Sequence, residues 1–237
     1  MEETTPETNA TKPSAEIPPE SKIGRLSSQV VSRHMPPSSA GEVLPNLWVG
    51  NLMSVGQVVS TTCSIGSANQ PSKKVVLTVI SVLSNPNLIK FAKDSIDQQR
   101  ERNQTSVEIH HVIIPLKDTV ESDLLAVLPN GMKIIDAALD GNNINNPSQS
   151  GTVHSDDDNL QRVCLVMCAK GASRSVSVVI AYLLSRHSNR FKTFDDALRH
   201  VRTVRPMACP NIGFSLALRQ FERQLHQNAK HSITKIL

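Results

Sequence analysis

The chain has 237 residues, of which 39% are hydrophobic and 19% charged, with a formal net charge of +4. This length suffices for one well-packed domain with tails or an insertion. The charge is too small and too dispersed to favour nucleic-acid binding, and no apolar run is long enough to span a membrane. The acidic start, Met1 to Thr5, predicts neither a secretory signal nor an organelle transit peptide.

The number and spacing of the cysteines indicate the redox state of the cellular compartment. The chain contains Cys63, Cys164, Cys168 and Cys209, without any CxxC spacing. This pattern argues against a disulfide framework and predicts an intracellular, reducing location in the cytoplasm, the nucleus or both. A free thiol stays reduced there and remains available as a nucleophile.

The first half of the chain alternates polar stretches with apolar runs. Residues 1–40 are rich in Pro, Ser, Thr and Glu, which predicts a disordered N-terminal tail. The folded part is predicted to begin at Leu44 to Asn51 with a short strand and a turn. Ser60 to Lys74 is predicted to be a loop. The β-branched run Val75 to Leu83 predicts a buried strand, and Ile89 to Arg102 predicts a helix.

The middle of the chain continues this alternation. Val107 to Leu116 predicts the next strand. Two short helices are expected over Glu121 to Leu128 and Asn130 to Asp140, because Pro129 between them disfavours a continuous helix. The Asn-rich stretch at about 141–160 is predicted to be an exposed polar insertion.

The last third completes the fold. Val163 to Met167 predicts a strand that leads into a loop and then a helix ending near Ser188. Thr193, with Asp196 three residues on, resembles a capping box that opens a helix to Val204. A final helix is expected from about Pro210 to Gln227. This order predicts an α/β fold with a central, mostly parallel, twisted sheet and helices on both faces, in one domain over residues 41–228 and a tail over 229–237.

The loop after the predicted strand Val163 to Met167 carries the chemistry. Cys168 and Arg174 form a Cys-x5-Arg pattern between a buried strand and a helix N-terminus. Backbone N–H groups that converge there bind anions, and they favour the thiolate of Cys168. The planar guanidinium of Arg174 matches two phosphoryl oxygens. The residues expected to cradle the phosphate are Ala169, Lys170, Gly171, Ala172 and Ser173.

This loop and three further stretches resemble the dual-specificity branch of the cysteine-dependent protein tyrosine phosphatases. The stretches are Leu44 to Asn51, Ile114 to Asp118 and the closing segment Ala197 to Phe214. The resemblance spans about Val43 to Glu222, in the family's order. It implies a small, single-domain phosphatase with the family's fold, which hydrolyses phosphotyrosine and phosphoserine/threonine in proteins without metal or cofactor.

The resemblance also implies roles for single residues. Cys168 would attack phosphorus and form a phosphocysteine, while Asp118 would protonate the leaving oxygen and then activate water. Ser175 would donate a hydrogen bond to the departing thiolate, or simply serve as a first-turn helix serine. Asn211 would orient water or substrate, or only cap the last helix. Asp123 competes for the acid role, but Asp118 directly follows the apolar strand, which favours it.

One position departs from the family pattern. Met167 stands where relatives usually carry the histidine that precedes the nucleophile. Methionine offers no hydrogen-bond donor, so we expect a smaller thiolate fraction and slower turnover at neutral pH. Two alternatives follow: a module that binds phosphoproteins with little or no turnover, and a phosphatase for lipid, sugar or nucleotide phosphates. Cys164, four residues before Cys168 on the same strand, is expected to be a buried core residue.

Overall fold

The structure is a computed structural model, and it describes residues 39–63, 74–103, 105–140 and 160–234. The strands are β1 (Ala40–Leu44), β2 (Leu47–Gly50), β3 (Lys74–Val82), β4 (Val107–Ile114) and β5 (Leu160–Met167). The helices are α1 (Ser54–Cys63), α2 (Pro86–Arg102), α3 (Leu124–Asp140), α4 (Arg174–Arg186), α5 (Phe194–Val204) and α6 (Ile212–Thr234). No helix among these described residues is both long and apolar enough to cross a bilayer.

The strands form one sheet in the order β1-β2-β5-β3-β4. All neighbouring pairs are parallel except β1 and β2, which are antiparallel, so the predicted mostly parallel sheet is confirmed. Gly50 of β2 and Ser81 of β3 both pair with Met167 of β5. The carboxyl ends of these three strands therefore meet at one edge of the sheet, where ligands bind in open α/β folds.

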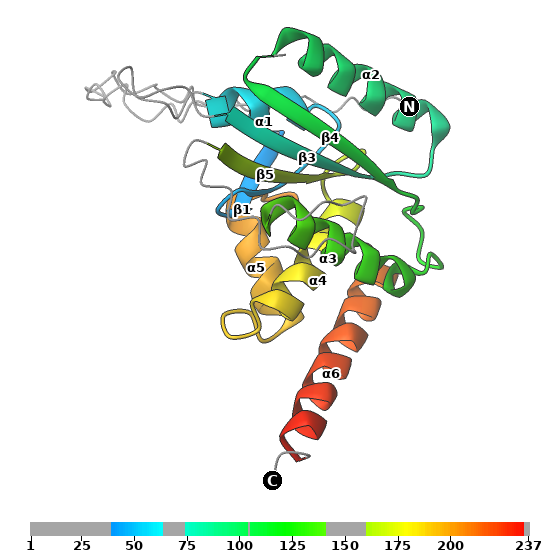
Figure 1. Ribbon diagram of the computed structural model, residues 1–237. Coiled ribbons are helices and arrows are strands. Elements are labelled where there is room, and N and C mark those ends of the chain that lie inside the picture. The colour runs from blue at the N-terminus through cyan, green and yellow to red at the C-terminus, as the bar shows by residue number, and fades with distance from the viewer. Residues whose placement is uncertain (1–38, 64–73, 104, 141–159, 235–237) are drawn as a thin grey trace, which may run out of the picture. The chain divides into compact units, whose positions relative to one another are not determined.

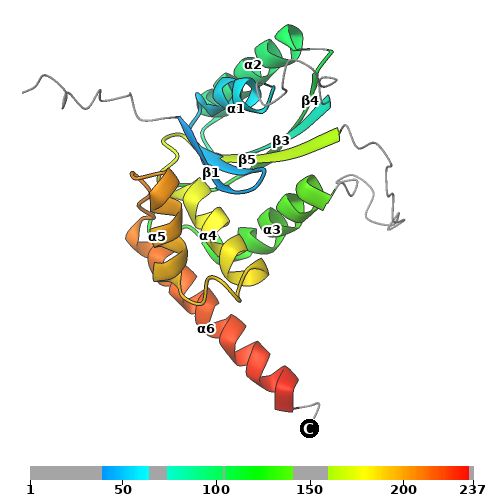
Figure 2. The ribbon, with the colours of Figure 1, turned by 90° about the vertical axis from the view of Figure 1, so that its left-hand side faces the viewer.

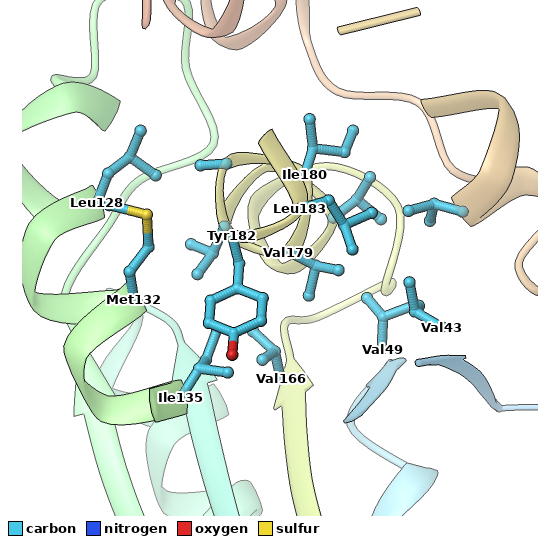
Figure 3. Packing of buried hydrophobic residues seen from close by; sticks show 14 of the residues in the cluster. Val43, Val49, Leu128, Met132, Ile135, Val166, Val179, Ile180, Tyr182 and Leu183 are labelled. Atoms are coloured by element: carbon cyan, nitrogen blue, oxygen red, sulfur yellow. The ribbon is translucent and has the colours of Figure 1, made fainter. Parts of the chain in front are cut away.

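Helices cover both faces of the sheet, as predicted from the alternating elements. Helices α1 and α2 lie on one face, and α3 to α6 lie on the other (Figure 1, Figure 2). Side chains along β5 alternate between two cores, with Met167 beside Trp48 in one and Val166 in the other. In the second core, the side chains of Tyr182 and Val179 from α4 point toward Val166 of β5 and Ile135 of α3 (Figure 3). These two apolar cores fix the position of the sheet edge at which the loop after β5 begins.

The prediction of two short helices around Pro129 is wrong, because α3 is continuous and contains this proline. Pro129 lies early in the helix, so its missing N–H removes only one hydrogen bond, the one to the Leu125 carbonyl. Buried Leu124, Leu128 and Ile135 lie along one stripe of α3. Burying each such side chain stabilises by about 1.5–3 kcal/mol, which together outweighs the proline's cost of about 3 kcal/mol.

The predicted loop over Ser60 to Lys74 is wrong at its start, because residues 60–63 belong to α1. Val55, Val58, Val59 and Thr62 form the buried face of this helix at helical spacing. The run of Ser and Thr around them masks this period in the sequence. Residues 64–73 lie outside the described residues, as does most of the predicted polar insertion, over 141–159.

Side-chain caps mark the starts of two of the predicted helices. The Asn85 side chain accepts hydrogen bonds from Asn87 N and Leu88 N, so α2 begins at Pro86, three residues before the predicted start. The Thr193 hydroxyl accepts from Asp196 N at 3.1 Å, which is the N-terminal half of the predicted capping box.

The outer strand β4 lies at an edge of the sheet, where backbone groups lack a neighbouring strand. The guanidinium of Arg100, from α2, donates to the Ile109 carbonyl from Nε at 3.1 Å and from Nη2 at 2.8 Å. This side chain therefore occupies a hydrogen-bonding position on the edge strand.

Candidate active site

The loop between β5 and α4 begins with Cys168 at the carboxyl edge of the sheet. The Cys168 N–H donates to the Gly50 carbonyl at 3.3 Å, which fixes the start of the loop to β2. Gly171 has a φ of 65°, a conformation that favours glycine. A Cβ at Gly171 would lie 2.5 Å from the Gly50 carbonyl carbon, so only glycine fits this close approach.

Two donors face the sulfur of Cys168, which is only 1% exposed. The backbone N–H of Gly171 lies 3.3 Å from Sγ, and the hydroxyl of Ser175 lies 3.2 Å from it. Both donors stabilise a negative charge on sulfur better than a neutral thiol. Ser175 is fully buried in the first turn of α4, so its hydroxyl is fixed beside the sulfur. The structure thus brings three residues predicted for the site together.

A buried arginine that sequence reasoning missed supports the same loop from behind. Arg205 is 2% exposed, and it donates from Nε to the Gly171 carbonyl at 3.0 Å and from Nη2 to the Lys170 carbonyl at 2.8 Å. Burial lowers the pKa of this guanidinium, and the negative charge of Cys168 partly opposes that shift. With these carbonyls tied to Arg205, the Gly171 amide is left to face Cys168. An arginine between Val204 and Pro206 was visible in the sequence, but only as part of a family match.

Asp118 lies next to the other end of the loop. Its Oδ1 accepts a hydrogen bond from the Ser173 hydroxyl at 2.7 Å and another from Asn211 Nδ2 at 2.9 Å. Its Oδ2 lies 3.5 Å from Nε of Arg174. The Asp118 side chain is 36% exposed, whereas that of Arg174 is 9% exposed. These contacts hold a carboxyl group at the mouth of the site and leave it open to solvent.

The guanidinium of Arg174 is short of acceptors. Its Nη1 donates to the Leu116 carbonyl at a long 3.4 Å. Its Nε is buried and has no hydrogen-bond partner among the described residues, because the contact to Asp118 is an ion pair without hydrogen-bond geometry. A buried N–H without a partner is costly, and an anion in the loop would supply the missing acceptor.

The structure confirms the helix-capping interpretation of Asn211. Its Oδ1 accepts from the Phe214 N–H at 2.9 Å, which caps α6, while its Nδ2 reaches Asp118. Asp123 has a different place: its Oδ1 accepts from the Ala126 N–H at 3.1 Å in the first turn of α3. This contact occupies Asp123 as a helix cap, while Asp118 is the carboxyl group in contact with Ser173 and Arg174.

The remaining residues predicted for the cradle line the loop. Ala169 and Ala172 are half-buried, and Lys170 is exposed at the rim. The Ala172 carbonyl accepts from the Cys209 N–H at 2.7 Å, so the segment before α6 is fastened to the loop. Small side chains at these positions leave the backbone N–H groups accessible to a ligand.

Comparison with known proteins agrees with this geometry. The family model described as the dual specificity phosphatase catalytic domain matches residues 148–224, which include the Cys168 loop. Dual specificity protein phosphatase 22 of Mus musculus is 27% identical over 192 residues, 80% of this chain and 78% of that protein. The chain is similar to dual-specificity phosphatases over most of its length.

Other relatives match over shorter stretches. Dual specificity protein phosphatase 1 of Arabidopsis thaliana is 44% identical over 61 residues, which are 26% of this chain and 29% of that protein. In four such relatives, at 44–45% identity, the match spans between 7% and 39% of the relative's length.

Solved structures of dual-specificity phosphatases share the fold. Human DUSP28 superposes with a TM-score of 0.52 at 22% identity, covering 80% of this chain and 97% of that structure. A mouse dual specificity phosphatase complexed with zinc tungstate gives 0.53 at 23% identity, covering 85% of this chain and 97% of that structure. At this level of identity the likeness shows the fold alone, which is the predicted one.

The Met167 departure from the dual-specificity phosphatase pattern has a clear structural setting. Met167 is completely buried in the apolar cluster under α1 and α2, together with Trp48 and Leu165. Its side chain thus lies in the core on the α1 and α2 side, while Cys168 belongs to the core on the opposite face. In this chain the two donors described above, from Gly171 and Ser175, face the sulfur.

Proposed function

We propose that this chain hydrolyses phosphotyrosine and phosphoserine/threonine in proteins through a cysteinyl-phosphate. The observation that carries the proposal is the convergence of Gly171 N–H and Ser175 hydroxyl on a buried sulfur. The buried Nε of Arg174, which has no hydrogen-bond partner among the described residues, adds a place for an anionic group beside the same loop. Similarity to the dual-specificity phosphatases supports this chemistry.

In the first step the thiolate of Cys168 attacks phosphorus, so the S–P bond forms as the ester P–O bond breaks. Arg174 and the loop amides stabilise the charge on the equatorial oxygens. Asp118 supplies the proton that the leaving oxygen takes. Ser173 and Asn211 both donate to Oδ1 of Asp118, so Oδ2 is the oxygen that carries this proton.

In the second step water attacks phosphorus, Asp118 accepts its proton, and the S–P bond breaks with its electrons returning to sulfur. The Ser175 hydroxyl, 3.2 Å from Sγ, stabilises the departing thiolate. Because the thiol is the nucleophile, it has to remain reduced, and we therefore also propose that the protein works in the cytoplasm, the nucleus or both.

The test compares hydrolysis of an aryl phosphate by the wild type and by Cys168→Ser, with acid quenching to detect phosphate bound to the chain. Cys168→Ser should reduce kcat/KM by about 10³-fold or more, since it removes the nucleophile. Asp118→Asn should cost about 10²–10⁴-fold. Asp123→Asn is the matched control, because Asp123 caps α3, and it should retain activity. Turnover that survives Cys168→Ser would overturn the proposal.

The burial of Met167 supports a second candidate, a module that binds phosphoproteins with little turnover. Methionine leaves the loop without the donor that the family usually has before the nucleophile. Single-turnover rates of the wild type across pH separate the two. A rate that rises with pH as the thiol ionises supports the enzyme, whereas phosphopeptide binding without Cys168-dependent turnover supports the module. A panel of nucleotide, sugar and inositol phosphates tests whether proteins are the preferred substrates.

A further inference from the structure

Large apolar side chains stand exposed around the proposed site. Among the described residues, six large apolar side chains are prominently exposed, and five of these belong to segments that contact the Cys168 loop or Asp118. We call these five the apolar rim: Met53 (66% exposed), Val120 (51%), Met207 (46%), Ile212 (63%) and Leu216 (60%). The sixth is Phe91 on α2. Isolated exposed apolar residues are ordinary, but their concentration around one loop marks a binding surface.

Three members of the apolar rim lie on the Asp118 side of the loop. Gly213 packs so closely against the backbone of Val120 that a Cβ there would overlap the Val120 carbonyl oxygen. This contact places Val120 beside the start of α6, where Ile212 is the first residue. Leu216 follows one turn later on the same helix face. Val120 and the first two turns of α6 therefore lie side by side, and three exposed apolar side chains stand on these two segments.

The other two members lie toward the Lys170 side of the loop. Met53 follows β2, whose last residue, Gly50, accepts the Cys168 N–H and lies against Gly171. Met207 follows Arg205, the side chain that holds the Lys170 and Gly171 carbonyls. Both methionines are thus within a few residues of a group that contacts this end of the loop. Methionine is a flexible side chain that adapts to varied apolar partners.

We propose that the apolar rim recognises a protein segment that carries large apolar side chains on both sides of its phosphorylated residue. This inference deepens the proposed function and rests on it. The rim residues belong to segments that contact the proposed phosphate site, so a segment bound there places its neighbouring side chains beside the rim. Because residues advance about 3.3 Å each along an extended segment, side chains one or two positions away reach past the loop.

The charges beside the rim favour a protein over a membrane as the partner. Exposed Glu121 and Asp123 flank Val120, and they would repel an anionic lipid surface. Exposed Lys117 and Lys170 lie nearest the loop, where they suit the phosphate itself. A neutral, apolar flanking sequence with one central phosphate matches this arrangement of charge.

The test uses phosphotyrosyl peptides that differ only at the two positions on each side of the phosphotyrosine, with leucine in one and serine in the other. The wild type should hydrolyse the leucine peptide with a kcat/KM about tenfold higher, which corresponds to partial burial of two leucines. In the double variant Ile212→Ser/Leu216→Ser this preference should fall to about twofold. Rates on an aryl phosphate normalise each variant for folding and chemistry.

Phe91→Ser is the matched control, because Phe91 is similarly exposed but lies on α2, and it should keep both the preference and the aryl phosphate rate. Fluorescence anisotropy measures how tightly each of the two peptides binds the Cys168→Ser variant. These dissociation constants give the same comparison without turnover. Wild type that hydrolyses aryl phosphate but shows no preference between the peptides overturns this inference alone. Wild type without any Cys168-dependent hydrolysis overturns the proposed catalysis instead, and the anisotropy preference still tests the rim.

A membrane partner gives a different result. Vesicles of phosphatidylcholine with a few per cent of phosphatidylinositol phosphate would then bind the wild type and lose the double variant, while the two peptides react equally. That combination overturns the inference in favour of a lipid surface. Equal vesicle binding by wild type and double variant, together with a leucine preference that the double variant loses, supports the protein segment.

Discussion

Cys164 lies in β5, and Cys168 directly follows this strand. Both cysteines are buried, yet their surroundings differ. Cys164 is in the middle of β5, between Leu47 of β2 and Thr78 of β3. Burial without compensation raises the pKa of this thiol far above its usual range. Cys168 follows the last residue of β5 and faces the Gly171 N–H and the Ser175 hydroxyl.

The difference shows that burial by itself makes a thiol inert. Inside the sheet, backbone N–H groups are engaged with neighbouring strands, so none is available to the Cys164 sulfur. At the end of the strand the chain leaves the sheet, and the amides of the following turn are free to face a sulfur. A cysteine at the end of a strand can therefore be a nucleophile, whereas one inside the sheet cannot. Variants at the two sites test the features that distinguish them.

The largest expected effect comes from Gly171→Ala, which breaks the turn that faces the sulfur. The positive φ and the overlap of a Cβ with Gly50 should lower the free energy of unfolding by about 2–4 kcal/mol. Activity should fall by at least about 100-fold, because the loop amides lose their alignment. Urea denaturation and aryl phosphate kinetics measure both.

Gly56→Ala provides the control for this change. Gly56 lies in α1, and its nearest neighbour for an added Cβ is the flexible Gln99 side chain at 3.4 Å. This variant should gain about 0.5–1 kcal/mol of stability and keep its activity. If Gly171→Ala behaved like Gly56→Ala, the close approach to Gly50 would not govern the loop.

Arg205→Lys should have the next largest effect, because lysine cannot hold the carbonyls of Lys170 and Gly171 together as the guanidinium does. We expect kcat/KM to fall about 10- to 100-fold and its acid limb to move to higher pH, since the loop amides stabilise the thiolate less well. Arg202→Lys is the control: Arg202 is exposed and donates to Ala208 outside the loop. If the pH profile of Arg205→Lys were unchanged, the role of Arg205 would be purely structural.

Arg205 is also an example of a site residue whose contacts the sequence alone does not predict. The Cys168 loop, β5 and α4 were predictable, because a Cys-x5-Arg pattern lies between an apolar strand and an apolar helix. Contacts between distant segments were not: Arg205 reaches the loop carbonyls across 34 residues, and no local period signals such a contact. Asn211 was predictable as a cap of the last helix, whereas its contact with Asp118 is visible only in the folded chain.

Local rules failed at two elements of the fold for the same reason. Pro129 argued for a break in α3, and the Ser and Thr residues around Val58 argued against α1. In both helices, burial of the apolar stripe contributes more to stability than the low helix propensity of Pro, Ser and Thr removes. The mostly parallel sheet and the helices on both of its faces followed from alternation alone, because parallel strands need helical crossovers.

Met167→His should produce a smaller, opposite change. A histidine before the nucleophile adds a donor near the loop, and we expect the rate at neutral pH to rise several-fold. Because Met167 is fully buried among apolar side chains, the imidazole should lower the free energy of unfolding by about 1–3 kcal/mol. Met167→Leu, which keeps volume and polarity, should change neither by much. A slower Met167→His enzyme with intact folding would show that the two existing donors suffice.

The smallest effect concerns the inert thiol. Burial raises the pKa of Cys164, so the folded chain keeps this proton at alkaline pH at which the unfolded chain releases it. The free energy of unfolding should therefore fall as the pH rises above about 8.5. Cys164→Ala should lower stability at pH 7, but it should flatten this alkaline decline. Cys209→Ala, at an exposed position, is the control and should keep the decline in urea titrations at pH 7 and pH 10.

The guanidinium of Arg100 on the Ile109 carbonyl has a consequence for the behaviour of this chain at high concentration. An open strand edge is a template on which a second molecule can align its own backbone and start a growing aggregate. With one acceptor of β4 already occupied by a bulky cation, an incoming strand would lose a ladder bond and meet a positive charge. The enzyme's outermost strand is thereby kept from recruiting copies of itself.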